Sequence, residues 1–316
     1  MLRLRRVVPF APRGRVSIAQ LTAELGLPAA HERFYSRILG LDQVASVGAL
    51  TVRDMLLSVG DETLADTDRS KIRYLIHVHS MQHVAPPAAR LVGSLRDKLG
   101  LPDATAFTLA NQGCASGLYC LGLAESLLRT EAPDARALIL VGEKALAPES
   151  RLIPGATLLG DGAAGVLVGL GGPGDEVLAI SHRTIGEFHE SRLMSRATLK
   201  RYQDMYVPMI GTVMREAAER AGFGLDDVSM VLPHNVNRFS WIEIGRRLDF
   251  PVERMYLDNV AELGHCYGSD PFVNLEAARA AGLVAPGDNV LMVSAGQGAV
   301  FTAVALRIGA KGDGDA

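Results

Sequence analysis

The sequence predicts an α/β protein with a mixed or parallel sheet that helices cover on both faces. Three observations support this fold class: strand-like and helix-like segments alternate, the strand-like runs are continuously apolar, and the second half repeats the plan of the first. Continuously apolar strands are typical of sheets that have no face in water. With 316 residues and 48% hydrophobic content, the chain suits one large or two medium domains.

The first half is expected to alternate strands with helices. Each expected strand is an apolar run, and each expected helix follows a strand, as in a sheet whose strands are linked by helices. The strands are expected at 72–79, 105–109, 137–142 and 165–169, and the helices at 88–99 and 115–129. A glycine-rich turn at 160–162 precedes the last of these strands.

The second half follows the same plan. Helices are expected at 201–221, 240–248 and 271–281, and strands at 228–233, 289–294 and 299–306. Each half ends with a strand, a glycine-rich turn and another strand, at 160–165 and at 296–299. This likeness indicates an internal duplication, although glycine turns between strands are common. The glycine-rich joint at 171–175 divides the chain into halves at 1–172 and 173–316.

Composition excludes several classes of protein. The net charge of −3 gives no reason to expect a nucleic-acid partner. No apolar run approaches the length of about 18 residues that spans a membrane. The basic residues at 3–6 resemble the start of a signal peptide, but the apolar run that follows is too short and too rich in proline. We therefore expect a cytoplasmic protein that binds neither nucleic acid nor membrane.

The three cysteines, Cys114, Cys120 and Cys266, are too few and too scattered for a disulfide framework, and no pair has metal-ligand spacing. Cys120 and Cys266 are expected to be packed thiols, as free cysteines usually are. His77 and His79 alternate within a strand and share a face, which would suit a metal pair. No third ligand is visible, so we expect no metal site.

Cys114 is the most informative residue of the chain. It follows a glycine at the end of an apolar strand-like run, within the segment 107–117, and it opens a long apolar helix. The unpaired N–H groups and the dipole at a helix N-terminus both favour a thiolate, which is the nucleophilic form. His234 and His265, more than a hundred residues later, could activate it further. Packing is the alternative, but the pattern favours an enzyme that loads an acyl group onto Cys114.

Five segments in order resemble the thiolase superfamily, specifically its β-ketoacyl-carrier-protein synthase III (ketosynthase III) branch. They lie at 111–117, 159–165, 233–237, 264–265 and 296–298. One such motif alone is weak, whereas five in the family's order and at about its spacing are strong. The resemblance implies a five-layered αβαβα fold built from two similar halves. It also implies a homodimer with the cysteine helix buried at its centre.

The resemblance assigns roles within the site. Cys114 would be the nucleophile, and its backbone N–H would form an oxyanion hole with one near Gly296 or Gln297. Such a donor is typically worth ~3 kcal/mol in the transition state. His234 would donate from Nε2 to a thioester carbonyl or take part in proton transfer. Asn237 is expected to be a structural hydrogen-bonding partner.

His265 departs from the family, which usually has asparagine at that position. His265 together with Asp270, five residues later, is similar to ketosynthase III-like acyltransferases of secondary metabolism. His265 would be the general base, and Asp270 would hold its other ring nitrogen. An alternative stays open for Asp270, because Asp followed by Pro271 and a helix is also typical of an N-cap.

Two further departures concern the acyl donor. The adenine-stacking tryptophan of the family has no equivalent, since residues 33–35 occupy about that place, and Phe239 stands where the family often has arginine. Both changes favour an acyl thioester on the phosphopantetheine of an acyl carrier protein over one on coenzyme A. No permanently bound cofactor is expected.

The expected reaction is ping-pong acyl transfer from the thioester through Cys114 to a small-molecule hydroxyl or amine acceptor. The main alternative is decarboxylative Claisen condensation with a malonyl thioester, in which His234 and His265 would promote loss of CO₂. Asp270 favours transfer over condensation. A non-catalytic subunit of a heteromeric synthase is a third possibility. The sequence leaves the acyl chain and the acceptor open.

Overall fold

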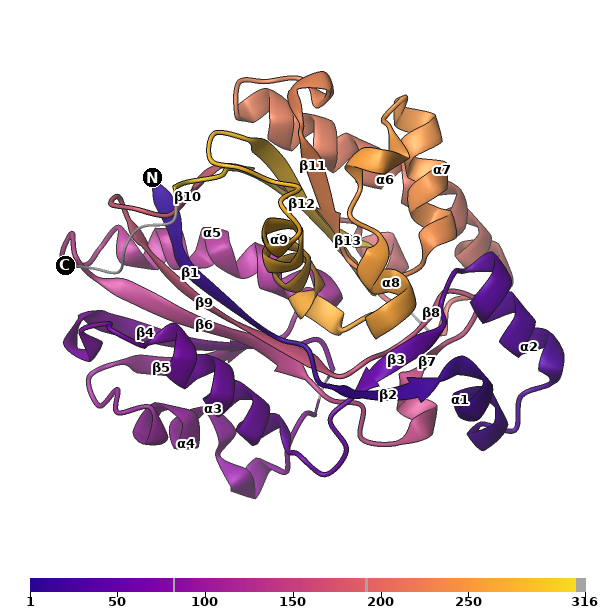
Figure 1. Ribbon diagram of the computed structural model, residues 1–316, viewed down its shortest axis with the longest axis horizontal. Coiled ribbons are helices and arrows are strands. Elements are labelled where there is room, and N and C mark those ends of the chain that lie inside the picture. The colour runs from indigo at the N-terminus through magenta and orange to yellow at the C-terminus, as the bar shows by residue number, and fades with distance from the viewer. Residues whose placement is uncertain (82, 191–192, 311–316) are drawn as a thin grey trace.

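The computed structural model describes residues 1–81, 83–190 and 193–310 (Figure 1). Within these residues, nine strands form one mixed sheet in the order β11-β12-β13-β10-β1-β9-β6-β4-β5. The bounds are β1 (Leu2–Phe10), β4 (Ile72–Val78), β5 (Thr105–Leu109), β6 (Arg136–Glu143), β9 (Gly162–Leu170), β10 (Asp175–Thr184), β11 (Met230–Pro233), β12 (Asn289–Gly296) and β13 (Val300–Arg307). Two small ribbons join β2 (Gly14–Ser17) to β3 (Gln43–Ser46) and β7 (Leu152–Ile153) to β8 (Thr157–Leu158).

The order of the strands repeats from the first part of the sheet to the second. Outward from β1, the pairs β1–β9 and β9–β6 are antiparallel, and β6–β4 and β4–β5 are parallel. Outward from β10, β10–β13 and β13–β12 are antiparallel, and β12–β11 is parallel. The two parts meet where Arg3 and Leu4 of β1 pair with Glu176 and Asp175 of β10. The loop 171–174 connects β9 to β10, and the division of the chain at 172 stays a prediction.

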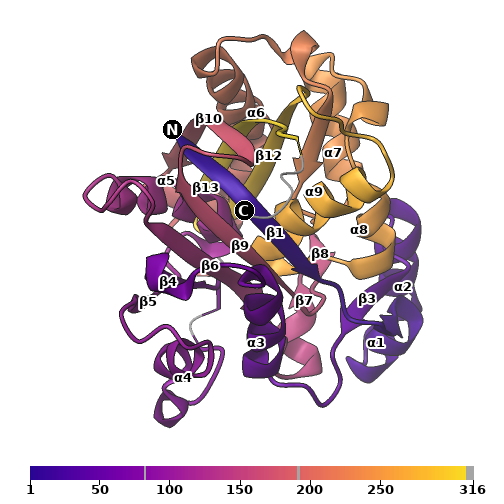
Figure 2. The same cartoon turned by 60° about the vertical axis from the view of Figure 1, so that its left-hand side comes forward.

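Helices and sheet alternate in five layers (Figures 1 and 2). The longer helices are α3 (Val52–Thr63), α4 (Leu91–Lys98), α5 (Ser116–Leu128), α6 (Arg196–Arg220), α7 (Arg238–Leu248) and α9 (Asp270–Ala280), and the short ones are α1 (Ile18–Glu24), α2 (Ala29–Arg33) and α8 (Asp258–Leu263). One core joins α3 and α4 to the outer face of the first part, and another joins α6 and α7 to the outer face of the second. The third core surrounds α5 and α9 between the two inner faces. The expected αβαβα layering is confirmed.

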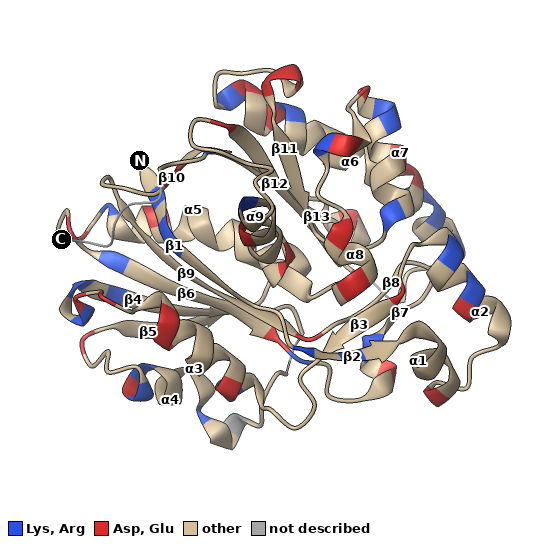
Figure 3. Cartoon of the chain, in the orientation of Figure 1, with Lys and Arg blue, Asp and Glu red and all other residues tan. Residues whose placement is uncertain are grey.

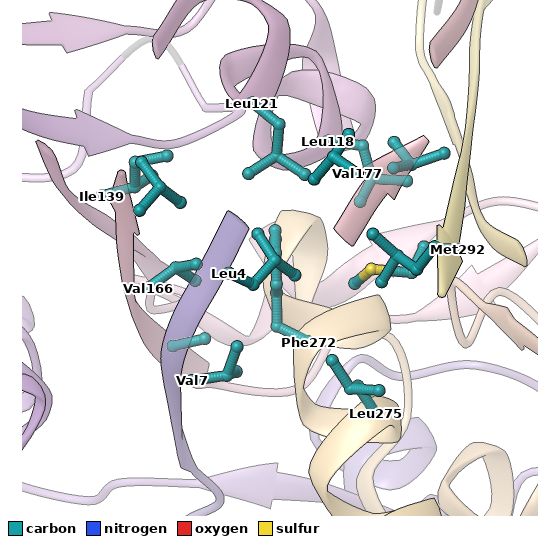
Figure 4. Packing of buried hydrophobic residues seen from close by; sticks show 14 of the residues in the cluster. Leu4, Val7, Leu118, Leu121, Ile139, Val166, Val177, Phe272, Leu275 and Met292 are labelled. Carbon is teal, nitrogen blue, oxygen red and sulfur yellow. The ribbon is translucent and has the colours of Figure 1, made fainter. Parts of the chain in front are cut away.

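The central core explains why α5 is apolar on nearly all sides. Leu118 and Leu121 of α5 and Phe272 and Leu275 of α9 are fully buried with Leu4 of β1 (Figure 4). A helix covered on all sides has no polar face to present to water. Each large apolar side chain buried here contributes roughly 1.5–3 kcal/mol. The turn that carries Cys114, at the start of α5, is therefore followed by a helix that is anchored in this core.

Each expected strand and helix overlaps an observed element of the same kind. The strand expected at 105–109 is β5, and the helix expected at 201–221 begins earlier, at Arg196, where the Ser195 side chain caps it. Among the longer elements, β1, α3 and β10 escaped sequence analysis, as did the short helices α1, α2 and α8 and the short strands β2, β3, β7 and β8. β1 was missed because three arginines and Pro9 interrupt its apolar pattern. In the fold, one of these arginines, Arg3, is paired with Glu176 at 3.2 Å.

Charged residues of both signs lie along the chain in the view of Figure 3. Acidic and basic segments are interspersed over the outer helices in the orientation of Figure 3, and the net charge of the chain is −3. In the described parts of the chain, no helix combines the length and apolar character needed to cross a membrane.

Candidate active site

Cys114 lies in a tight turn, Gly113–Ala115, between the end of β5 and the start of α5. Gly113 has φ +53°, and a Cβ there would lie 2.9 Å from the backbone nitrogen of Gln297. Only glycine fits such a conformation and such a close approach. Ser294 of β12 donates a hydrogen bond to the Cys114 carbonyl at 2.9 Å. The turn is thus held by the second half of the chain, and the Cys114 side chain is 7% exposed.

The expected oxyanion-hole residues come together at this turn. A Cβ on Gly296 would overlap the carbonyl oxygen of Gln112 and would lie 3.2 Å from the Cys114 nitrogen. The backbone of Gly296 and Gln297 is therefore packed directly against the turn that carries Cys114. Their role as hydrogen-bond donors to an oxyanion stays a prediction.

His265 lies between α8 and α9 and is buried. Its main chain is fixed on both sides, because its N–H donates to the Leu158 carbonyl at 3.2 Å and its carbonyl accepts from Gly160 at 3.0 Å. Its ring nitrogen Nδ1 is 2.5 Å from Oδ2 of Asp270. Nε2 is the ring nitrogen left to interact with Cys114, and a hydrogen bond with the Cys114 side chain supports a charged imidazole.

Asp270 is the first residue of α9, and Ser269 occupies the N-cap position. The Asp270 carboxylate also accepts from the Asn235 backbone at 2.6 Å and from the Cys266 backbone at 2.8 Å. Its bonds thus point back toward His265, away from the first turn of its own helix. The N-cap interpretation of Asp270 is therefore wrong.

The charges of the site favour an imidazolium at His265. Burial opposes a charge there, but the Cys114 and Asp270 side chains outweigh it and raise the pKa of His265 to about 10. An opposite charge in a buried site acts strongly because water screens it little. The arrangement can therefore hold a thiolate, an imidazolium and a carboxylate in series.

His234 follows β11, and its ring lies beside that of His265, with 5.6 Å between the ring centroids. Burial and then the charge of His265 hold the pKa of His234 well below its usual range, so this ring is neutral. Its Nε2 is 3.0 Å from the hydroxyl of Tyr206, on α6. The structure thus places His265 against Cys114, His234 beside His265, and Tyr206 against His234.

Asn237 caps α7, since its Oδ1 accepts from the Ser240 backbone at 2.7 Å. Its Nδ2 donates to the Ala156 carbonyl at 2.9 Å. Both bonds fix the loop that carries His234.

Three residues of the site were missed by sequence analysis: Ser80, Glu143 and Tyr206. The buried Glu143 carboxylate accepts from the Ser80 hydroxyl and backbone, both at 2.5 Å, and the Ser80 oxygen lies 3.8 Å from the Cys114 sulfur. Burial raises the pKa of Glu143 despite the opposing hydrogen bonds from Ser80. An acidic residue at the end of an apolar strand was the available signal for Glu143. No pattern marked Ser80 or Tyr206.

The other cysteines are packed thiols, as expected. Cys120 and Cys266 are buried, and burial raises the pKa of both. The rings of His77 and His79 lie side by side, 5.0 Å apart. Across residues 1–81, 83–190 and 193–310, no group of three or more His, Cys, Asp or Glu side chains is arranged to hold a metal ion.

Comparison with known proteins finds similarity to β-ketoacyl-[acyl-carrier-protein] synthase III. The profile described as 3-oxoacyl-[acyl-carrier-protein (ACP)] synthase III, C terminal, matches residues 218–308, which include His234 and His265. The β-ketoacyl-[acyl-carrier-protein] synthase III of Nitratidesulfovibrio vulgaris is 28% identical over 249 residues, or 71% of this chain and 72% of the relative. The protein of the same name from Pseudomonas aeruginosa is 24% identical over 318 residues, or 94% of each chain.

Solved structures show the same fold. The acyltransferase ChlB3 is similar with a TM-score of 0.87 over 99% of both chains, at 20% identity. FabH from Pseudomonas aeruginosa is similar with a TM-score of 0.80 over 98% of both chains, at 23% identity. The priming β-ketosynthase of the R1128 polyketide pathway has a TM-score of 0.79 over 98% of this chain and 97% of its own, at 19% identity. Proteins named as an acyltransferase, a 3-oxoacyl synthase and a β-ketosynthase therefore share this architecture.

Proposed function

We propose that this chain, a ketosynthase III-like protein of the thiolase superfamily, is an acyltransferase that moves an acyl group from a thioester through Cys114 to a hydroxyl or an amine. The observation that supports transfer is the pair of His265 and Asp270, 2.5 Å apart and buried beside Cys114. A nucleophile, a base and a carboxylate that orients the base form the arrangement that acyl transfer requires.

In the first half-reaction, the Cys114 thiolate attacks the carbonyl carbon of the donor thioester. A new carbon–sulfur bond forms to Cys114, and the bond to the donor sulfur breaks. The proton on His265 Nε2 passes to the departing sulfur, so the donor leaves as a free thiol. The backbone N–H groups of Cys114 and of Gly296 or Gln297 would stabilise the negative oxygen of the tetrahedral intermediate.

Formation of the acyl-enzyme changes His265 from an acid into a base. The charge of Cys114 is the largest of the effects that raise the pKa of His265, and a thioester carries no charge. Once Cys114 is acylated, this charge is lost and the pKa of His265 falls. Burial, which disfavours the charged imidazole, then has a larger share in setting that pKa. A neutral imidazole results, which is what the second half-reaction needs.

In the second half-reaction, His265 Nε2 takes the proton of the acceptor hydroxyl or amine while its oxygen or nitrogen attacks the acyl carbon. The bond to Cys114 breaks, and the ester or amide is released. Asp270 stabilises the imidazolium that forms. Thiolate and imidazolium are thereby restored for another cycle.

Decarboxylative condensation is the second candidate, and the neighbouring rings of His234 and His265 favour it. A malonyl thioester would lose CO₂, and the resulting carbanion would attack the acyl-enzyme. This reaction needs hydrogen-bond donors to an enolate oxygen, whereas transfer needs a base.

The donor is proposed to be an acyl carrier protein thioester, with coenzyme A as the alternative. A homodimer is proposed as well: β5 lies at the edge of the nine-stranded sheet, and an unpaired edge is open to a partner strand. Size-exclusion chromatography with light scattering distinguishes a dimer from a monomer.

Intact-protein mass spectrometry tests the function. The protein and its Cys114→Ala variant are incubated with acyl thioesters on carrier protein and on coenzyme A. A mass increase of one acyl group on the native protein alone identifies the acyl-enzyme and its donor. Chasing that species with hydroxyl and amine acceptors, or with a malonyl thioester, then separates transfer from condensation. Absence of any adduct would contradict the proposal and favour a non-catalytic subunit.

A further inference from the structure

The hydroxyl of Tyr206 forms a hydrogen bond with Nε2 of His234. Tyr206 comes from α6, and its oxygen is 3.0 Å from Nε2 of His234. Its ring is held edge-on between those of Tyr202 and Phe301, with centroids 5.9 Å away in each case. Packed side chains on both sides leave the hydroxyl little freedom to turn away.

The direction of this hydrogen bond follows from the state of the two groups. Burial raises the pKa of Tyr206 well above its usual value, with Tyr202 and Cys114 adding to the effect, so the phenol keeps its proton. Among the described residues, that proton has no acceptor other than His234. The Tyr206 hydroxyl therefore donates, and Nε2 of His234 accepts.

The remaining proton of His234 is then on Nδ1. The Val293 carbonyl interacts with the ring, although Nδ1 does not reach it with regular hydrogen-bond geometry. A neutral imidazole carries one donor and one acceptor nitrogen. With Nε2 as the acceptor, this nitrogen of His234 carries no proton that it could donate to a substrate.

This matters for the choice between the two candidate reactions. Loss of CO₂ from a malonyl thioester moves an electron pair onto the thioester oxygen, which needs a donor. His265 is bonded to Asp270 through Nδ1 and interacts with Cys114. With Nδ1 of His234 assigned to the side of the Val293 carbonyl, Nε2 of His234 is the imidazole nitrogen that could serve as a further donor. Transfer to a hydroxyl or amine requires the base His265 and makes no demand on His234 Nε2.

We propose that Tyr206 is a specificity-determining, positioning residue: it keeps Nε2 of His234 as an acceptor and thereby suppresses decarboxylation of malonyl thioesters. This inference rests on the proposed transferase function. It explains how a site with one cysteine and two histidines is directed toward transfer.

The test compares wild type, Tyr206→Phe and Tyr202→Phe. Tyr206→Phe keeps the packed ring and frees Nε2. Tyr202→Phe is the matched control, because it removes a hydroxyl from a half-buried tyrosine one helical turn away, whose ring packs against that of Tyr206. Each protein is incubated with malonyl thioester, and CO₂ and acetyl thioester are quantified; the latter forms when the enolate takes a proton from water.

Decarboxylation by Tyr206→Phe should rise by about tenfold or more, because a hydrogen-bond donor is restored. Tyr202→Phe should remain at the wild-type level. Unchanged decarboxylation by Tyr206→Phe would overturn the proposal. Lower decarboxylation would overturn it as well, because it would show that the Tyr206 hydroxyl itself serves as the donor. An equal rise in both variants would also overturn it, because it would reflect general loosening of the site.

A spectroscopic readout separates tautomer control from a structural role. In protein with ¹⁵N-labelled histidine, the Nε2 resonance of His234, assigned by its loss in His234→Gln, should have the shift of an acceptor nitrogen in wild type. It should move in Tyr206→Phe and stay in place in Tyr202→Phe. No movement in Tyr206→Phe would contradict the proposal. Acyl-enzyme formation is measured in parallel, so failure of the transferase proposal shows as a missing adduct in all three proteins.

Discussion

Nδ1 of His265 and Oδ2 of Asp270 are 2.5 Å apart in a fully buried environment. The same carboxylate accepts from the backbone of Asn235, the residue after His234, and from that of Cys266, the residue after His265. One side chain therefore connects the loops that carry both histidines. Loss of its charge should affect the orientation of the base and the rigidity of both loops.

Asp270→Asn is expected to slow the second half-reaction by about 10²–10⁴-fold, since the imidazolium loses its carboxylate and the ring loses its fixed tautomer. The measurement is the rate at which a preformed acyl-enzyme disappears when an acceptor is added. Asp258→Asn, at an exposed position on α8, is the matched control and should leave this rate unchanged. A normal discharge rate in Asp270→Asn would show that the carboxylate only supports the fold.

The raised pKa of His265 predicts the pH dependence of acylation. The first half-reaction needs the proton of His265, so its rate should fall as pH rises through about 10. The free energy of unfolding should also depend on pH through the titration of His265, whose pKa is higher in the folded protein than in the unfolded chain. Its stabilising contribution is complete below the ordinary pKa of about 6.5 and is lost as pH rises toward 10.

Burst kinetics of thiol release and urea unfolding, both between pH 6 and 10, measure these effects. His265→Asn, which introduces the residue usual in the family, should flatten this part of the stability profile. If the wild-type and His265→Asn profiles run parallel, His265 is neutral in the resting protein and the thiolate–imidazolium pair is wrong.

The close approach of Gly296 to the nucleophile turn gives a third prediction. A methyl group at this position would overlap the Gln112 carbonyl, so Gly296→Ala should displace the turn and the backbone donors beside it. Loss of one oxyanion donor lowers the rate by about 10²–10³-fold, and a comparable loss in kcat/KM for acylation is expected. Gly186→Ala, where a methyl group would meet nothing within 4 Å, is the control. Normal acylation by folded Gly296→Ala would exclude this backbone from the oxyanion hole.

Sequence analysis predicted the parts of the site that depend on neighbouring residues. Cys114 was identifiable because a nucleophile at a helix start needs a glycine before it and an apolar helix after it. His265 and Asp270 were identifiable as a pair because they lie five positions apart on one loop. The bond between them was expected, but the N-cap alternative stayed open, since an aspartate before a proline is equally typical of an N-cap.

The residues that were missed reach the site only through folding. Tyr206 lies on a long helix, where an aromatic residue at helical spacing is typical of any core. Ser80 follows β4, and its contact with Glu143 joins positions 63 residues apart. The fold shows the same limit: apolar strands such as β5 were found, while β1, with its three arginines, required knowledge of its partners β9 and β10.

His77 offers a prediction that concerns stability alone. Its ring is buried on β4, with Nε2 3.3 Å from the Gly142 carbonyl, and burial followed by the nearby His79 lowers the pKa of His77 to about 4. The folded protein thus prefers the neutral ring, whereas the unfolded chain takes up a proton near pH 6.5. The stabilising effect is complete above that value and is lost as pH falls toward 4. At most about 3 kcal/mol is involved.

Urea unfolding of the wild type between pH 7 and 4 should therefore show a steeper loss of stability than that of His77→Gln. Glutamine keeps a donor for the Gly142 carbonyl and cannot take up a proton. His31→Gln, at an exposed position, is the control and should follow the wild type. If His77→Gln loses stability with the wild-type slope, the ring is protonated in the folded protein at acidic pH, and the cavity that His77, His79 and His83 line admits enough water to solvate its charge.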